Sequence, residues 1–122
     1  MNKETELQVL DNQARMVADQ LEKVDSNIME IEYLKNSLGE LKTSKEGADI
    51  LAPLSNGIFV KATLSKNDKL LVNVGNGIVV EKSVEDTKKL LDERISEISE
   101  MRDKLINQMQ KIEDRLIKIG ED

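Results

Sequence analysis

The chain has 122 residues, enough for one domain, and its composition is typical of long helices, since 34% of the residues are charged and 2% are aromatic. It contains neither cysteine nor histidine, which excludes disulfides, thiolate chemistry and the usual zinc ligands, so we expect no metal, no cofactor and a reducing, cytoplasmic location. A formal charge of −6 argues against a nucleic-acid partner, and no stretch approaches the roughly 18 apolar residues of a membrane span, so we expect no membrane partner either.

The first predicted element is a long helix over residues 3–46. Apolar residues recur at alternating steps of three and four, the heptad pattern of a coiled coil. This seam consists of Leu7, Leu10, Ala14, Val17, Leu21, Val24, Ile28 and Ile31. The strict heptad frame then puts Lys35 in the seam, whereas Leu34, Leu38 and Leu41 predict a three-residue step, or stammer. Lys42 and Lys45 followed by Gly47 indicate the end of the helix.

Residues 50–82 change to the period of two that is typical of strands. Ile58, Val60, Ala62 and Leu64 share one face, Leu70, Val72 and Val74 share another, and Ile78 and Val80 continue it. Asn56-Gly57 and Gly75-Asn76-Gly77 supply the residues that adopt positive φ in tight hairpin turns. We therefore expect two β-hairpins, with Ser65-Lys66-Asn67-Asp68 between them.

A second long helix is predicted over residues 83–120. Ser83 is the expected N-cap, with Asp86 three residues later as its capping-box partner. Every seventh residue is then apolar: Val84, Leu91, Ile98, Leu105, Ile112 and Ile119. The alternate seam positions hold Ile95, Met109 and Leu116, interrupted by Lys88 and Arg102.

The two helices have similar predicted lengths, and this match favours an antiparallel pairing within the chain, because unequal helices would leave an apolar seam unpaired. We therefore predict an α+β fold over residues 1–122 as a single domain. It consists of a long antiparallel two-helix coiled coil joined through two central β-hairpins.

The hairpins are expected to assemble with other chains. Two isolated hairpins are marginal in water and expose both unpaired edges and apolar faces. Pooling strands from several subunits into an intersubunit β-barrel resolves both problems, so we predict an obligate oligomer. The candidate assembly residues are Leu51, Leu54, Ile58, Phe59, Val60, Leu70, Val72, Val74, Ile78 and Val80.

Apolar residues are also unusually frequent where the first helix begins and the second ends. They are Leu7, Val9, Leu10, Ile112, Leu116, Ile117 and Ile119. One interpretation is that they complete the coiled-coil seam. The other is that they form a tip that frays and binds exposed apolar segments of a client polypeptide, because coiled-coil ends gain little from such side chains.

Nothing in the sequence favours an enzyme. Gly75-Asn76-Gly77 contains a GxG, but no third glycine opens a helix behind it, so a hairpin turn explains it better than a phosphate loop. The serines have no histidine to activate them, and carboxylates on a solvated coil lack the buried pocket that shifts a pKa for acid–base work. We expect no catalytic and no cofactor-binding residues.

The central run resembles the α-class subunits of prefoldin, an archaeal and eukaryotic co-chaperone. The resemblance rests on Ile50-Leu-Ala-Pro-Leu-Ser-Asn-Gly-Ile-Phe-Val60 and on Leu71-Val-Asn-Val-Gly-Asn-Gly-Ile-Val-Val-Glu-Lys-Ser83. It implies a hexamer of two α-type and four β-type subunits whose hairpins form a double β-barrel. It also implies an ATP-independent chaperone that captures unfolded polypeptides at the coiled-coil tips and delivers them to a group II chaperonin.

Two functions therefore remain open from the sequence. The first is this chaperone subunit, whose partners are β-type prefoldin subunits, unfolded clients and the chaperonin. The second is a structural coiled-coil scaffold or filament-forming subunit that polymerises through the same hairpins. The two differ at the tip, because only the chaperone requires apolar tip residues for its activity.

Overall fold

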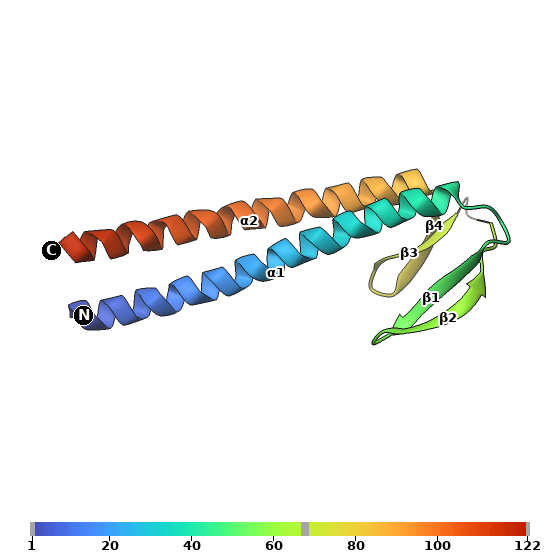
Figure 1. Cartoon of the computed structure of the whole chain (residues 1–122). Coiled ribbons are helices and arrows are strands. Elements are labelled where there is room, and N and C mark those ends of the chain that lie inside the picture. Colours follow the sequence, from blue (N-terminus) through green and yellow to red (C-terminus); the bar gives the residue numbers. More distant parts are fainter. Residues whose placement is uncertain (1, 67–68, 122) are drawn as a thin grey trace. The chain divides into compact units, whose positions relative to one another are not determined.

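The computed structural model describes residues 2–66 and 69–121 of the chain, so part of the predicted linker Ser65–Asp68 lies outside the described residues. The elements follow the predicted order: helix α1 (Lys3–Thr43), strands β1 (Asp49–Ser55) and β2 (Ile58–Thr63), strands β3 (Leu70–Gly75) and β4 (Ile78–Lys82), and helix α2 (Val84–Glu121) (Figure 1). The chain divides into two units, which are described separately. The first unit contains α1 up to Glu32 and α2 from Glu93, and the second unit is Tyr33–Asp92.

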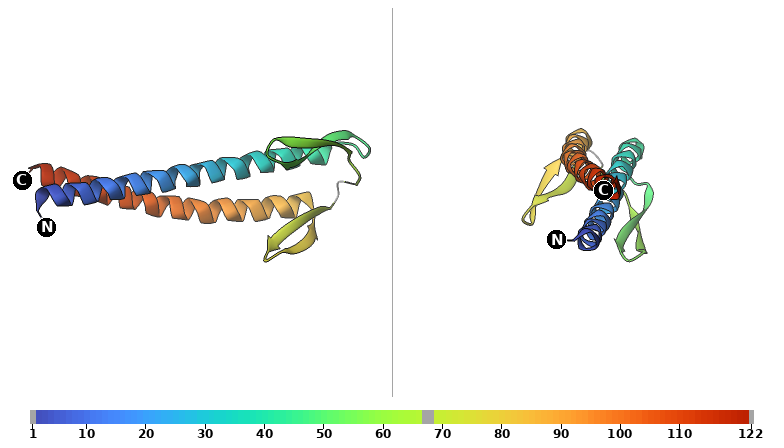
Figure 2. Two further views of the ribbon diagram at one scale, coloured as in Figure 1. Left: turned by 90° about the horizontal axis from the view of Figure 1, so that it is seen from below. Right: turned by 90° about the vertical axis from the view of Figure 1, so that its left-hand side faces the viewer.

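In the first unit, the predicted seam residues form the core between α1 and α2. The buried cluster consists of Val17, Val24, Leu105 and Ile112, with Leu10, Ala14, Leu21, Ile28, Ile98, Met109 and Leu116 packed against it. Two ion pairs join the helices, and the later of the two positions on α1 is paired with the earlier of the two on α2. Arg115 Nε donates to Glu6 over 2.7 Å, and Arg102 Nε donates to Asp25 over 2.6 Å. The helices therefore run antiparallel, and the blue start of α1 lies by the red end of α2 (Figure 2).

In the second unit, the heptad frame of α1 continues through Lys35 and Leu38, so the step predicted at Leu34 is wrong, and only at the next position does Leu41 rather than Lys42 turn inward. Leu34 is 45% exposed, whereas Lys35 is half-buried and Leu38 is buried. Lys35 takes the seam position because its Nζ pairs with Asp92 of α2. A lysine can place its methylene stem along apolar neighbours while its ammonium group reaches a carboxylate, so it interrupts the seam without breaking the frame.

Three of the interhelical ion pairs, all except Glu6–Arg115, are evenly spaced along both helices. Asp25 and Lys35 are ten residues apart on α1. Their partners on α2, Arg102 and Asp92, are also ten residues apart, in the opposite chain direction. The next pair, Lys42 with Glu85, is a further seven residues along each helix. Glu85 is also one of two acidic residues in the first turn of α2, a position where negative charge is favoured by the helix dipole.

Helix α1 ends at Thr43, slightly earlier than residue 46. The hydroxyl groups of Thr43 and Ser44 both donate to the carbonyl of Glu40, at 2.8 and 3.1 Å, and close the last turn. Gly47 then adopts a φ of 87° and donates its N–H to the carbonyl of Leu64 over 2.7 Å. The chain therefore joins the first hairpin almost as soon as the helix stops.

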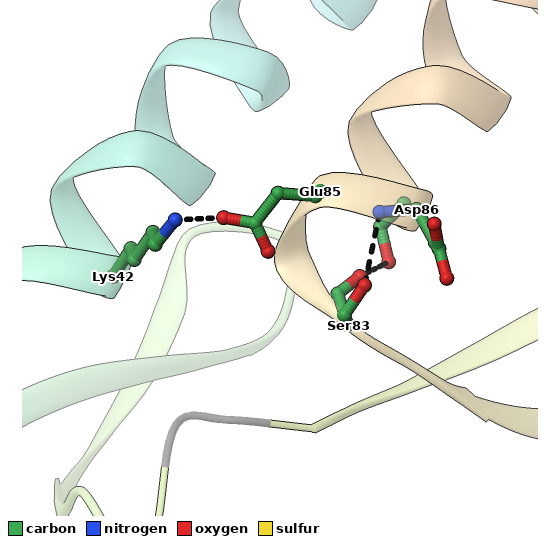
Figure 3. Close-up of polar contacts among 5 residues, drawn as sticks. Lys42, Ser83, Glu85 and Asp86 are labelled. Carbon is green, nitrogen blue, oxygen red and sulfur yellow. Dashed lines mark hydrogen bonds and ion pairs between the residues drawn. The ribbon is translucent and has the colours of Figure 1, made fainter.

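Helix α2 begins at the predicted cap. The backbone N–H of Asp86 donates to Ser83 Oγ over 3.1 Å (Figure 3). The hydroxyl of the buried Thr87 donates to the Ser83 carbonyl over 2.8 Å. Lys42 reaches Glu85 in the same turn (Figure 3). The start of α2 is thus held both by its own cap and by α1.

We expect Ser83→Ala to lower the free energy of unfolding by about 1 kcal/mol, because the N–H of Asp86 loses its acceptor. Denaturant unfolding followed by circular dichroism measures this difference. Ser96→Ala is the matched control, since Ser96 is exposed within α2 and its loss should change stability by less than about 0.5 kcal/mol. Equal losses in the two variants would contradict a capping role for Ser83.

The two hairpins are separate two-stranded antiparallel sheets, β1 with β2 and β3 with β4 (Figures 1 and 2). Both turns are Asn-Gly pairs with positive φ, 51° and 77° at Asn56-Gly57 and 52° and 75° at Asn76-Gly77, as the sequence predicts. Such turns match the right-handed twist of paired strands. Each hairpin has one register shift just before its turn, between Pro53 and Ser55 and between Asn73 and Gly75.

The register of each hairpin confirms the predicted faces. In the first hairpin Ala52 is opposite Val60 and Ile50 is opposite Ala62. In the second hairpin Val72 is opposite Val80. Because alternate residues of a strand share a face, each hairpin presents one predominantly apolar face.

Candidate functional site

The hairpins carry the largest group of exposed apolar side chains, which we call the hairpin surface. Seven of its ten predicted residues are exposed: Leu51, Leu54, Ile58, Phe59, Val60, Val74 and Ile78. The other three, Leu70, Val72 and Val80, are half-buried. Contiguous exposed apolar side chains on two-stranded sheets with unpaired edges mark a surface that another protein covers.

The structure adds Leu71 and Val79 to the hairpin surface. They are 75% and 56% exposed, and lie on the opposite face of the second hairpin from Val72 and Val80. Period-two reasoning omitted them because it assigns only one face to the interior. The signal was present in the uninterrupted apolar runs Leu70-Leu71-Val72 and Ile78-Val79-Val80, which are typical of strands covered on both faces.

The predicted tip residues fall into two groups. Leu10, Ile112 and Leu116 belong to the core of the first unit, and Ile119 is buried with 4% exposure. Leu7, Val9 and Ile117 remain exposed, the first two at 38% and the third at 61%, and we call these three the exposed tip residues. The four residues of the first group therefore complete the coiled-coil seam. The exposed tip residues are apolar side chains that a partner can reach.

Neither helix, as far as the structure describes it, is long and apolar enough to cross a membrane. Within the same residues, no cluster of three or more acidic side chains is arranged to hold a metal ion.

Comparison with known proteins assigns the family. The model of the prefoldin family, described as prefoldin subunit, matches residues 10–121. The chain belongs to the prefoldin family. This is a family of chaperones rather than enzymes, and the resemblance predicted from the central hairpins is confirmed.

Curated relatives of this prefoldin chain are archaeal α subunits. Prefoldin subunit alpha of Methanobrevibacter smithii is 28% identical over 109 residues, covering 89% of this chain and 74% of that protein. The α subunit of Pyrococcus horikoshii is 30% identical over 112 residues, with 91% and 76% coverage. That of Thermococcus onnurineus is 37% identical over 93 residues, with 75% and 63% coverage.

A solved structure supports the fold independently. The filamentous PFD from Methanocaldococcus jannaschii, determined by cryo-electron microscopy, matches with a TM-score of 0.86 and covers 100% of this chain and 99% of that one. Sequence identity between the two is 21%. The chain, with its two long helices and two central hairpins, therefore has a prefoldin fold.

Proposed function

We propose that the chain is an α-type prefoldin subunit that acts as an ATP-independent molecular chaperone in the cytoplasm. It binds unfolded polypeptides at its coiled-coil tip and delivers them to a group II chaperonin. The observation that carries this proposal is that accessible apolar side chains occur in both units, as the hairpin surface in one and as the exposed tip residues in the other. One surface serves assembly and the other serves clients.

Assembly supports client binding through avidity. The hairpin surface joins with β-type subunits in a barrel, giving a hexamer of two α-type and four β-type subunits. Each tip offers only a few partly exposed apolar side chains, so a single tip binds a client weakly. Several tips on one platform raise the effective concentration of binding sites, and the client is held without being locked in one conformation.

A second candidate is a scaffold that forms filaments through the same hairpins. It is favoured by one observation, the description of the solved structure with the matching fold as filamentous PFD. In that case copies of this chain pair through the hairpin surface without a β-type partner.

Native mass spectrometry of the chain, alone and mixed with an archaeal β-type prefoldin subunit, separates these functions. We expect a mixed hexamer that suppresses aggregation of guanidinium-unfolded rhodanese in the absence of ATP. Long homo-oligomers that ignore the β-type subunit would favour the scaffold. A mixed hexamer that leaves rhodanese aggregation unchanged would overturn the client-binding part of the proposal.

A further inference from the structure

A groove runs between α1 and α2 in the first unit, and neither surface described above includes it. It is lined by Gln13, Met16, Val17, Gln20, Gln108, Lys111 and Ile112 and encloses about 390 Å³. This volume lies within the range of roughly 300–1,000 Å³ of ordinary ligand sites. Val17 and Ile112 are buried core residues and provide an apolar floor, while Met16 is 63% exposed at the edge. The groove therefore combines apolar contact with access from solvent.

Three glutamine side chains give this groove its chemistry. Each primary amide can donate two hydrogen bonds and accept two, which is the pairing that peptide N–H and C=O groups require. Among the described residues, the amides of Gln13, Gln20 and Gln108 have no protein hydrogen-bond partner. They are available to a main chain lying in the groove, and amides do not discriminate between side chains of different charge.

The groove side of α1 is nearly free of charge although the rest of that helix segment is acidic. Residues 1–32 contain eight acidic and three basic side chains. Val9, Gln13, Met16 and Gln20 follow one another at steps of four, three and four, so they share one face of α1. The acidic residue in line with them is Glu6, which is paired with Arg115. An apolar and amide face in a helix with this charge balance favours an uncharged partner such as a polypeptide main chain.

The same face connects the groove to an exposed tip residue. Val9 is one turn before Gln13, and Gln20 is two turns after Gln13, about 10.5 Å along the helix. An extended chain covers that distance in about three residues. A client held at Val9 can therefore continue along α1 into the groove without leaving the helix face.

We propose that this groove binds a short extended segment of the unfolded polypeptide, with glutamine amides pairing with its main chain and Met16 contacting its side chains. The proposal rests on the client-binding function proposed above and adds a second, sequence-independent contact to it. Methionine suits this role, because its flexible, polarizable side chain adapts to differently shaped partners. Lys111 at the groove edge provides one charged contact for acidic or aromatic client residues.

Two glutamine variants of the assembled complex test the proposal. Gln20→Glu replaces an amide of the groove with a carboxylate, which cannot donate to a peptide carbonyl. Gln8→Glu makes the same change on the same helix outside the groove, and both residues are exposed, so neither variant should affect folding. Titration with fluorescently labelled, guanidinium-unfolded rhodanese should show affinity about fivefold weaker for Gln20→Glu and unchanged for Gln8→Glu. Equal affinities would overturn the proposal.

Photo-crosslinking provides a second readout, with p-benzoylphenylalanine in place of Met16, Met29 or Leu7. Met29 is 72% exposed in the same unit but does not line the groove, so it is the matched control. We expect rhodanese to crosslink at positions 16 and 7 and much less at 29. Crosslinking at position 7 alone would overturn the groove while leaving the proposed function intact. Crosslinking at none of the three positions would overturn both the groove and the proposed function. Crosslinks at position 16 between copies of this chain would show that the groove binds a second subunit and not the client.

Discussion

Val72→Asp should abolish assembly of the complex. Val72 lies opposite Val80 on the apolar face of the second hairpin and is already half-buried within one chain. In the proposed barrel this face is covered completely, so the new carboxylate is buried without a partner at a cost of about 3 kcal/mol or more. That cost raises the dissociation constant more than about a hundredfold. Native mass spectrometry at micromolar concentration should then show separate subunits in place of the hexamer.

Asn76→Asp is the matched control for this prediction. It introduces the same charge into the same hairpin, at an exposed position of the turn and outside both strand faces. Asn76 has a positive φ of 52°, and Asp-Gly forms this kind of turn as Asn-Gly does. The control should assemble normally, and an intact hexamer with Val72→Asp would contradict the assignment of the apolar face to the barrel.

The fold could be predicted from the sequence because its two periods are unusually clear. Val84, Leu91, Leu105, Ile112 and Ile119 recur at multiples of seven, and all five are buried. The hairpin turns follow from Asn-Gly pairs, whose positive φ values are a local property of these residues. In both cases a short-range rule decides the conformation, and the sequence contains all the information that the rule needs.

The stammer was mispredicted because the choice depended on a distant partner. Heptad counting finds a polar residue, Lys35, at a position where it expects an apolar one, and therefore assigns the neighbouring Leu34 to the seam. Asp92, which is far away in the sequence, pairs with the lysine and makes the regular frame the better solution. No rule based on the periodicity of α1 alone includes that carboxylate.

The candidate site was predicted as a region rather than as individual residues. Leu7 and Leu10 belong to the same predicted seam, but Leu10 packs into the core while Leu7 remains 38% exposed. Which seam residue is covered depends on where the antiparallel partner ends, which the pattern of one helix does not specify. The groove lined by Gln13, Gln20 and Gln108 could not be predicted for the same reason, since it forms only where residues of both helices come together.

The exposed tip residues give the prediction that tests client binding most directly. Replacing Leu7, Val9 and Ile117 together by serine should leave the hexamer intact and reduce affinity for unfolded rhodanese about threefold or more, because both copies of this chain lose apolar contacts while the four β-type subunits keep theirs. Substitutions of exposed side chains usually change stability by less than about 0.5 kcal/mol each. Aggregation suppression and guanidinium unfolding, measured on the same samples, separate the two effects.

The choice of these three residues matters because the neighbouring seam residues cannot give a clear answer. Leu10 and Leu116 pack against the buried cluster, so serine at those positions would weaken the coiled coil as well as any client contact. A matched control replaces Met29, Met101 and Ile106 by serine, since all three are exposed in the same unit and belong neither to the tip nor to the groove. If both triple variants lost affinity equally, clients would bind any exposed apolar side chain of the coiled coil. If only the tip variant lost it, binding would depend on the place where the first helix begins and the second ends.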